Sequence, residues 1–259
     1  MLKIENVDIY GWEAAIRGCR NPLNSWGKSD SAFQHGDDYR TINDDAADSE
    51  FIAEQIASGR LYDRVFIGPN DYKLMQNLCK GGSEESKWRR FVHVTCDITA
   101  PLYFYKELDT YRAGVEKNSC STMHKIHAKE FTRDDFSCEH LIDCGNPEEV
   151  PTIAVGEGFN TIENELMRFW PSDILDLTIV MLNRSRQLFL QTKDKRYWWQ
   201  MIQLLPSSYN QRRTYEFNYE SLANIYRQRN SHRLDEWHQF CDRLKELPYS
   251  EFITLEPPN

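Results

Sequence analysis

The spacing of hydrophobic and polar residues predicts helices through most of the C-terminal half of the chain. Residues 173–192 carry an apolar stripe at helical spacing, and Ser172 precedes them as a good N-cap. A second helix is predicted over residues 196–205, where Pro206 ends it because proline has no N–H to donate. Two more amphipathic segments follow, YESLANIYRQR and LDEWHQFCDRLKEL. The stripe of the first helix comprises Ile174, Leu175, Thr178, Leu182 and Leu188.

The N-terminal half mixes strand and helix patterns. The segment FVHVTCDI alternates and is rich in β-branched residues, so it predicts a strand, and LKIENVDIYG predicts a short strand or turn. One helix is expected to begin at Asn70 or Asp71, both good N-caps, and to end at Gly81 and Gly82. The helices expected in this half cover residues 11–20, 51–59, 71–79 and 100–112.

Two long segments show neither the helical nor the strand period of apolar residues. Residues 24–48 are polar and predict a loop, and residues 128–170 are irregular and rich in Asp, Glu and Gly. No internal repeat and no low-complexity linker divides the sequence. We therefore expect residues 1–259 to form a single α/β domain with a central sheet flanked by helices and a mostly helical C-terminal half.

Composition restricts the classes of function. The chain has 259 residues, of which 40% are hydrophobic and 13% aromatic, enough for a sizeable core. Its formal charge of −9 argues against a protein that grips a nucleic-acid backbone, which needs a basic face. A small anionic ligand remains compatible, because it needs only a few local arginines and N–H groups.

The seven cysteines occur without a repeating spacing. The sequence shows no basic-then-apolar leader, and no apolar run approaches the length of a membrane span. We therefore expect a cytoplasmic protein with reduced thiols that does not enter a membrane. Cys138, His140 and Cys144 form one compact cluster, but they lack the paired spacing of zinc ligands, so we expect a loop there and no metal site.

Three polar segments are candidates for chemistry. The segment CKGGSEESKWRR joins a Gly-rich turn to a basic cluster, which suits a phosphate, although a helix C-cap and a solvated turn explain it equally well. In YRAGVEKNSCSTMHK, Arg112 is a bidentate anion donor, but an ordinary polar loop is the simpler interpretation. Polar residues recur at helical spacing in NYESLANIYRQRNSHR, which indicates either a ligand-facing helix or a solvated face. The candidates are Ser83, Arg112, Ser119, Ser121, Thr122, Asn218, Asn224 and Arg229.

In their order along the chain, these segments resemble the flavin-dependent thymidylate synthases, which methylate dUMP with FAD and a folate. The most specific part is LLPSSYNQRRTYEFNYESLANIYRQRNSHRLDEWHQFCDRL, which is similar to the family's Leu-Pro turn, aromatic strand and Asn-x-x-Ser-Leu-x-Asn helix. LMQNLCKGGSE resembles its flavin-phosphate loop, and VHVTCDITAPLYFYKELDTYR resembles the strand and helix before its signature motif. AAIRGCRNP is similar to its N-terminal Arg-x-x-Arg turn.

The resemblance implies a flavin-dependent thymidylate synthase-like fold, FAD as cofactor and a homotetramer whose sites are shared between subunits. It implies C5 methylation or hydroxymethylation of a pyrimidine deoxynucleoside monophosphate, with methylenetetrahydrofolate and NADPH as co-substrates. Arg229 matches the arginine that orients the pyrimidine. The positions that match FAD-binding residues are Ser83, Arg112, Asn218 and Asn224, to which we add Arg90 as a replacement cation.

The signature motif departs from the family. Thr110-Tyr111-Arg112 stands where the family has Arg-His-Arg, so two guanidinium groups are missing. Each charge-assisted contact of this kind contributes about 1.5–3 kcal/mol, so dUMP would bind far more weakly unless other cations replace them. Cys120 or Ser121 falls on the family's serine position. Tyr111 and residues 119–122 are expected to line the substrate site.

Glu107 replaces the glutamine that precedes the triplet. A carboxylate accepts from an amino group, so dCMP becomes a candidate substrate beside dUMP. Cys120 could add to C6 of the pyrimidine as a thiolate, although a small residue filling a serine-sized site is the simpler interpretation. A second class of function stays open, a flavin- or nucleotide-binding homologue that has lost synthase activity and acts in regulation or assembly.

Overall fold

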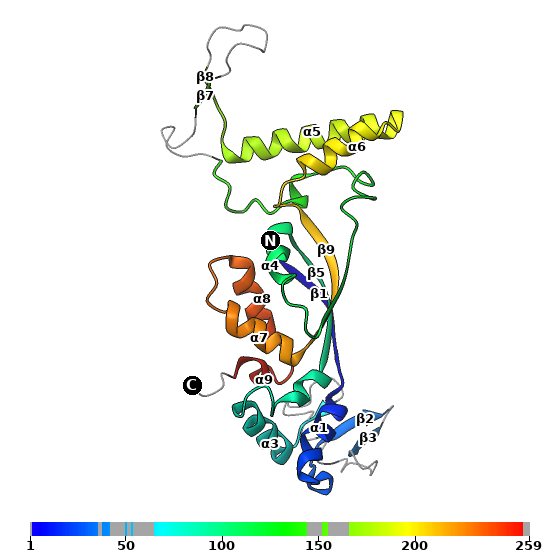
Figure 1. Ribbon diagram of the computed structural model, residues 1–259, viewed down its shortest axis with the longest axis vertical. Helices are drawn as coiled ribbons and strands as arrows, with labels where there is room; N and C mark the ends of the chain where they lie inside the picture. Colours follow the sequence, from blue (N-terminus) through cyan, green and yellow to red (C-terminus); the bar gives the residue numbers. More distant parts are fainter. Residues whose placement is uncertain are drawn as a thin grey trace. The chain divides into compact units, whose positions relative to one another are not determined.

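The computed structural model describes residues 2–35, 38–41, 50, 53, 65–143, 152–154 and 166–255. The chain divides into two compact units, whose elements are labelled in Figure 1. The sheet unit comprises residues 2–98, 108–118 and 214–259, and the α5–α6 unit comprises residues 99–107 and 119–213. The expected single domain of residues 1–259 stays a prediction.

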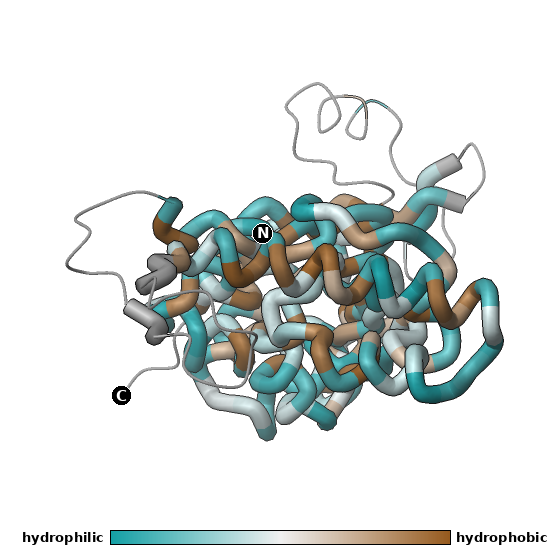
Figure 2. Tube along the Cα trace, turned by 90° about the horizontal axis from the view of Figure 1, so that it is seen from above, coloured by the Kyte–Doolittle hydropathy of each residue, from teal (hydrophilic) through white to brown (hydrophobic). Residues whose placement is uncertain are grey.

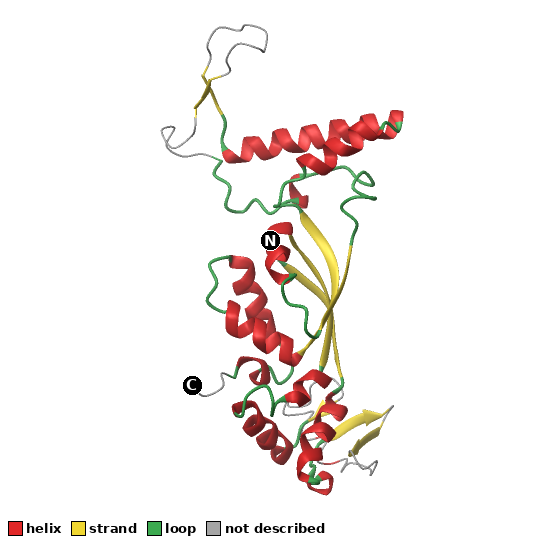
Figure 3. Cartoon of the chain, viewed as in Figure 1, coloured by secondary structure: helices red, strands yellow, loops and turns green. Residues whose placement is uncertain are grey.

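A four-stranded sheet, drawn with the other strands in yellow in Figure 3, has the strand order β1-β5-β9-β6. Side chains of a strand alternate between two faces, and β5 buries Val94, Cys96 and Ile98 on one of them. The boundary between the two units falls within β5 and β9. The strand predicted for FVHVTCDI is confirmed, and LKIENVDIYG, predicted as a short strand or turn, forms a strand. The four strands are β1 (Lys3–Tyr10), β5 (His93–Pro101), β6 (Val115–Ser119) and β9 (Asn210–Asn218).

Aromatic side chains form much of the core of the sheet unit. The Trp12 ring lies edge-on to Tyr219 with centroids 5.0 Å apart, and Trp88 meets Phe252 in the same way at 5.0 Å. Such edge-to-face contacts tie together helices that are far apart in sequence. The helices are α1 (Trp12–Arg20), α3 (Pro69–Lys80), α7 (Tyr219–Arg229), α8 (Asp235–Lys245) and α9 (Glu251–Thr254), with 3-10 turns η1 (Asn21–Leu23), η2 (Trp26–Lys28) and η3 (Lys87–Phe91).

The loop predicted over residues 24–48 is wrong in part. A second sheet of order β3-β2-β4 places β2 (Ala32–His35) and β3 (Asp38–Thr41) within that range. Its third strand, β4 (Val65–Phe66), pairs antiparallel with β2, so that Phe33 faces Val65. The third strand lies some thirty residues from β2 in sequence. The two strands of the local hairpin have only four residues each, too few to show a clear strand period.

A buried ion pair joins α1 to α3. Asp71 is 1% exposed, and its carboxylate accepts from Arg20 Nε at 2.7 Å, Ser29 Oγ at 2.6 Å and Ser31 Oγ at 2.7 Å. Asp71 therefore does not cap α3, contrary to the sequence prediction. Asp30 does so instead, because its carboxylate accepts from the N–H groups of residues 70 and 71 at 2.9 and 3.1 Å.

The α5–α6 unit has a core of its own beneath a long helix. Figure 2 shows apolar positions recurring along the helical traces. Asn183 Oδ1 accepts from Phe131 N at 2.9 Å and so ties α5 to the preceding loop. The elements are α4 (Leu102–Leu108), η4 (Arg133–Asp135), β7 (Thr152–Ala154), β8 (Leu166–Arg168), α5 (Pro171–Thr192) and α6 (Lys195–Leu204). The core comprises Ile126, Phe131, Phe136, Leu175, Leu182 and Met201.

Most predicted helices are confirmed with shifted ends. Ser172 lies inside α5 and is buried, because the helix begins at Pro171 after Trp170. Trp170 N donates to Asp173 Oδ2 at 2.8 Å, which replaces the predicted serine cap. Apart from residue 53, the helix expected over residues 51–59 lies outside the described residues. Within the part of the chain that the structure describes, no helix is both long and apolar enough to cross a membrane.

Candidate functional site

Helix α7 carries most of the polar residues selected from the sequence. Asn218 is its N-cap, where Oδ1 accepts from Ser221 N at 2.8 Å, and Ser221 Oγ donates to Asn218 O at 2.7 Å. Capping satisfies a backbone N–H that has no partner within the helix. The Asn218 side chain therefore has a structural role whether or not it also contacts a ligand.

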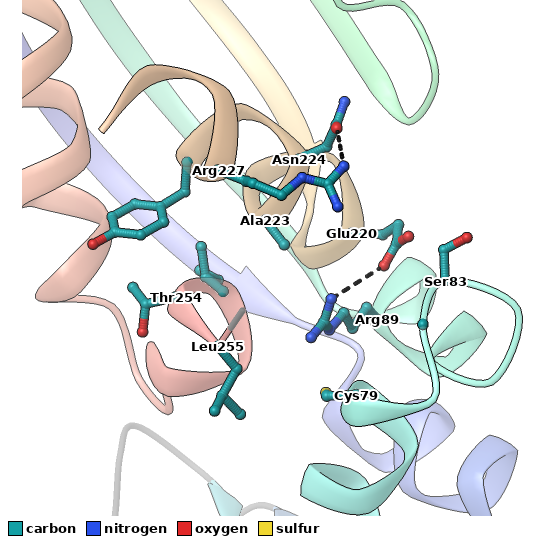
Figure 4. A pocket seen from close by; sticks show the side chains of 12 residues that line it. Cys79, Ser83, Arg89, Glu220, Ala223, Asn224, Arg227, Thr254 and Leu255 are labelled. Atoms are coloured by element: carbon teal, nitrogen blue, oxygen red, sulfur yellow. Dashed lines mark hydrogen bonds and ion pairs between the residues drawn. The ribbon is translucent and has the colours of Figure 1, made fainter. Parts of the chain in front are cut away.

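A pocket of about 290 Å³ lies among α7, the loop after α3, η3 and α9 (Figure 4). Ser83 and Asn224, two of the predicted FAD-binding residues, both line it. Gly82 has a φ of 91°, and no atom lies within 4 Å of the position of an added Cβ, so the turn leaves open space. The other lining residues are Cys79, Arg89, Glu220, Ala223, Tyr226, Arg227, Ile253, Thr254 and Leu255.

Two arginines and one glutamate give this pocket a positive charge. Arg89 is 7% exposed, and its Nη1 lies 3.5 Å from Glu220 Oε2 (Figure 4). Arg89 Nε is buried and bonds to none of the described residues. Arg227 Nη2 donates to Asn224 Oδ1 at 3.0 Å. A buried guanidinium with a long ion pair and an unmade hydrogen bond suits an anionic ligand, because a buried donor without a partner is costly.

Arg229, the predicted pyrimidine-orienting residue, is the last residue of α7. Its Nε donates to Tyr111 Oη at 2.8 Å, and its guanidinium carbon lies 5.6 Å from the Tyr111 ring centre and 5.4 Å from that of Trp237. Tyr111 Oη donates to Gln228 Oε1 at 2.9 Å, and Gln228 Nε2 donates to Asn224 Oδ1 at 3.0 Å. The structure thus brings three predicted residues into one hydrogen-bonded chain.

Arg112 lies on a segment that approaches Asn218. Gly114, two residues after it, has a φ of 68°, and a Cβ there would lie 2.2 Å from Asn218 Nδ2. Asn218 N also donates to Gly114 O at 3.2 Å. Only a glycine allows this close approach. Arg112 itself is exposed, and its guanidinium bonds to no residue in the described part of the chain.

The remaining predicted residues belong to the α5–α6 unit, apart from Arg90. Glu107 is half-buried in α4. Ser121 Oγ accepts from His124 N at 2.8 Å, as in a local turn, and Cys120 N donates to Arg212 O at 3.0 Å. Their assignment to the substrate site stays a prediction. Ser119, Cys120 and Ser121 are exposed, and Thr122 is half-buried.

Arg227 is not among the residues predicted from the sequence, and Arg89 is only one member of the basic cluster Lys87, Arg89 and Arg90 from which Arg90 was selected. Arg90 is exposed and does not line the pocket, whereas its neighbour Arg89 is buried there. Glu220 and Arg227 lie four residues before and three residues after Asn224, so helical spacing identifies both as neighbours on one face. Arg89 gives no such signal, because the five residues of η3 are too few to show a period.

No protein-family model matches the sequence, and no curated protein matches it. Solved structures do resemble it. Thymidylate synthase X (ThyX) of Helicobacter pylori with FAD and dUMP has a TM-score of 0.56 and 15% identity, over 99% of this chain and 98% of that one. A second structure of flavin-dependent ThyX from Helicobacter pylori, also complexed with FAD and dUMP, has a TM-score of 0.56 and 15% identity, over 97% of this chain and 98% of that one. The UMP/dUMP methylase PolB of Streptomyces cacaoi, bound with 5-Br dUMP, has a TM-score of 0.51 and 13% identity, over 95% of this chain and 89% of that one.

At these identities the similarity establishes the fold. The alignments extend over nearly the whole chain. The predicted α/β class is confirmed. The chain has the fold of the flavin-dependent thymidylate synthases.

Proposed function

We propose that the chain binds FAD, with part of the cofactor in the pocket beside α7, and transfers a one-carbon group to C5 of a pyrimidine deoxynucleotide. The fold shared with an enzyme solved with FAD and dUMP supports this function. The observation that carries it is the buried Arg89 Nε, which has no partner among the described residues and belongs to a residue of the pocket.

The pocket residues fit a phosphate or diphosphate group of FAD. Arg89 and Arg227 would bind its oxygens, and Ser83 would donate its hydroxyl proton. Glu220 opposes a second negative charge, but its 3.5 Å separation from Arg89 marks a weak pair that an incoming phosphate can displace. A pocket of about 290 Å³ is small for a whole dinucleotide, since ligand pockets span roughly 300–1,000 Å³. We expect the rest of FAD to bind outside it.

A homotetramer would supply the remaining contacts. Helix α5 exposes four apolar side chains on one face, which is unusual for a surface that stays in water. Two copies of α5 packed against each other would bury these apolar side chains. The four are Ile174 (46%), Leu177 (49%), Val180 (61%) and Met181 (52%).

In the proposed reaction, Arg229 orients the pyrimidine, and Tyr111 and Trp237 fix the plane of its guanidinium. The one-carbon donor would be methylenetetrahydrofolate. Its methylene carbon needs two electrons to become a methyl group, and bound flavin, reduced by NADPH, is the chemistry that supplies them. Tyr111 and residues 119–122 would contact the nucleotide.

The choice of base would depend on Glu107. A carboxylate accepts the hydrogen bond of a cytosine amino group, whereas uracil offers a carbonyl oxygen at that ring position. We therefore propose dCMP as a substrate beside dUMP. Calorimetry of dCMP and dUMP binding tests this choice. If dCMP binds no tighter than dUMP, the proposed role of Glu107 in selecting the base is wrong.

Flavin uptake is the first test. Purified chain, incubated with excess FAD and desalted, should be yellow. Arg89→Met should weaken FAD binding at least about tenfold, because it removes a charge-assisted contact. Ser83→Ala, a change at an exposed position that should not disturb folding, should weaken it by a smaller factor. Lys73→Met, exposed on α3 and outside the pocket, is the control. Colourless protein that takes up no FAD would exclude both flavin functions.

Turnover is the second test. The FAD-loaded chain is given NADPH, methylenetetrahydrofolate and either nucleotide, and the product is identified by mass spectrometry as methylated or hydroxymethylated. FAD and nucleotide binding without any product would favour the alternative function in regulation or assembly. Cys120→Ser should keep its activity if the residue only fills space, whereas loss of turnover with normal nucleotide binding would indicate a nucleophilic thiol.

A further inference from the structure

Tyr111 occupies the centre of a chain of hydrogen bonds that runs along α7. Arg229 Nε lies 2.8 Å from its hydroxyl oxygen, and Gln228 Oε1 lies 2.9 Å from the same oxygen. Asn224 Oδ1 lies 3.0 Å from Gln228 Nε2 and 3.0 Å from Arg227 Nη2. Asn224 and Arg227 line the pocket, and Arg229 lies at the end of the same helix.

The chemistry of these groups sets the direction of every bond in the chain. An arginine N–H can only donate, so the Tyr111 oxygen accepts from Arg229 and its proton is directed to Gln228 Oε1. Gln228 must then turn its NH₂ toward Asn224, whose oxygen accepts from both Gln228 and Arg227. Asn224 Nδ2 is consequently turned away from these residues. A single phenol hydroxyl thereby orients both an arginine and a distant amide.

The Arg229 guanidinium is held in plane as well as in position. Its carbon lies over two rings, at 5.6 Å from Tyr111 and 5.4 Å from Trp237. A cation over an aromatic face is attracted to it, and the hydrogen bond through Nε fixes rotation about the side chain. Loss of the Tyr111 hydroxyl would leave the rings in place but free this rotation.

We propose that Tyr111 is a positioning residue that couples the nucleotide end of α7, at Arg229, to the flavin end, at Asn224. This inference rests on the proposed function. Binding of a pyrimidine nucleotide to Arg229 would stabilise the Tyr111 hydrogen bond and, through Gln228, the orientation of Asn224 toward the cofactor. By linkage, each ligand would then raise the affinity of the other by the same factor.

The test compares Tyr111→Phe with two other variants. Gln228→Leu removes the hydrogen bonds from Tyr111 to Gln228 and from Gln228 to Asn224, while it leaves the hydrogen bond between Arg229 and Tyr111 intact. Tyr10→Phe is the matched control, because Tyr10, like Tyr111, is a tyrosine of the sheet unit whose hydroxyl donates to a side chain. Its acceptor is Glu216, at 3.0 Å, outside this site. Calorimetry gives the dissociation constant of FAD with and without dUMP, and that of dUMP with and without FAD, for every protein.

We expect dUMP to raise the affinity of the wild-type chain for FAD severalfold. Tyr111→Phe should abolish this factor and weaken dUMP binding about tenfold, since the hydroxyl accepts from a charged donor. Gln228→Leu should abolish the factor with a smaller loss of dUMP affinity. Tyr10→Phe should retain both the coupling factor and the wild-type affinity for dUMP. Unfolding midpoints without ligand should show that all four proteins are folded.

Three results would overturn the inference. Tyr111→Phe that keeps wild-type coupling, or wild-type protein that binds both ligands without coupling, removes the role of Tyr111 but leaves the proposed function intact. Wild-type protein that binds neither FAD nor a pyrimidine nucleotide removes the proposed function, and the coupling role with it. The two failures are distinguished by the wild-type titrations alone.

Discussion

At the level of single residues, the buried pair of Arg20 and Asp71 shows that tertiary packing can override the capping preference of an aspartate. A carboxylate at the start of a helix normally caps it. Asp71 instead accepts from Arg20 and two serines, and Asp30 of a distant segment caps the helix. The carboxylate is surrounded by donors, and these hydrogen bonds offset the cost of burying it.

Asp71→Asn should therefore destabilise the chain by about 3–5 kcal/mol, because the amide leaves the buried Arg20 charge without its partner. Urea unfolding at pH 7 measures the change. Asp176→Asn is the matched control: Asp176 pairs with Arg133 at 2.6 Å on the surface, where solvent screens the pair, so its midpoint should hardly move. Equal losses in the two variants would show that the Arg20–Asp71 pair has no special weight.

Thiol reactivity provides a second prediction at this level. Burial raises the pKa of Cys96 to about 12 and that of Cys241 to about 11, so both thiols stay protonated at pH 8. Cys120 is exposed. Brief treatment of folded protein with iodoacetamide should label Cys120 and leave Cys96 and Cys241 unmodified, as peptide mass mapping can show. Labelling in urea should reach all three, and equal labelling in the folded state would contradict their burial.

Among the elements, the stability of α7 depends on the residue that precedes it. Asn218 caps the helix, and its amide also contacts the Gly114 turn. Because the same residue is also predicted to contact FAD, loss of function on its substitution has two explanations. A pair of variants separates them.

Asn218→Ala should lower stability by about 1 kcal/mol through loss of the cap. Asn218→Asp keeps an oxygen that accepts from Ser221 N and should stay close to wild-type stability, as thermal unfolding can measure. If FAD affinity falls in both variants, Asn218 contacts the cofactor through its NH₂ group. If it falls only with alanine, the residue acts through the helix. A full loss of stability in the aspartate variant would refute the capping role.

For the whole molecule, the exposed face of α5 bears on assembly. Leu177 and Met181 are 49% and 52% exposed, and one charge at each should prevent a second copy from packing there. The double variant Leu177→Glu/Met181→Glu should reduce the native mass of the assembly measured by mass spectrometry. Asn77→Glu, exposed on α3, should leave it unchanged. An unchanged mass for the double variant would exclude α5 as the contact between copies.

Local patterns in the sequence predicted α5, α7 and β5 well, because a helix or strand that buries one face must repeat apolar residues at its own period. They also placed Asn218, Asn224 and Arg229 on one helix. The second sheet was missed, since β2 and β4 pair across a long separation and each is short.

By itself, then, the sequence determined which segments are helical, which face of each is apolar, and which polar residues α7 carries. Only the tertiary structure decided that Arg89 rather than Arg90 lines the pocket, that Asp30 caps α3, and that Tyr111 meets Arg229. The physical reason is that periodicity reports the burial of a single element. A contact between residues far apart in the chain depends on how separate elements pack together.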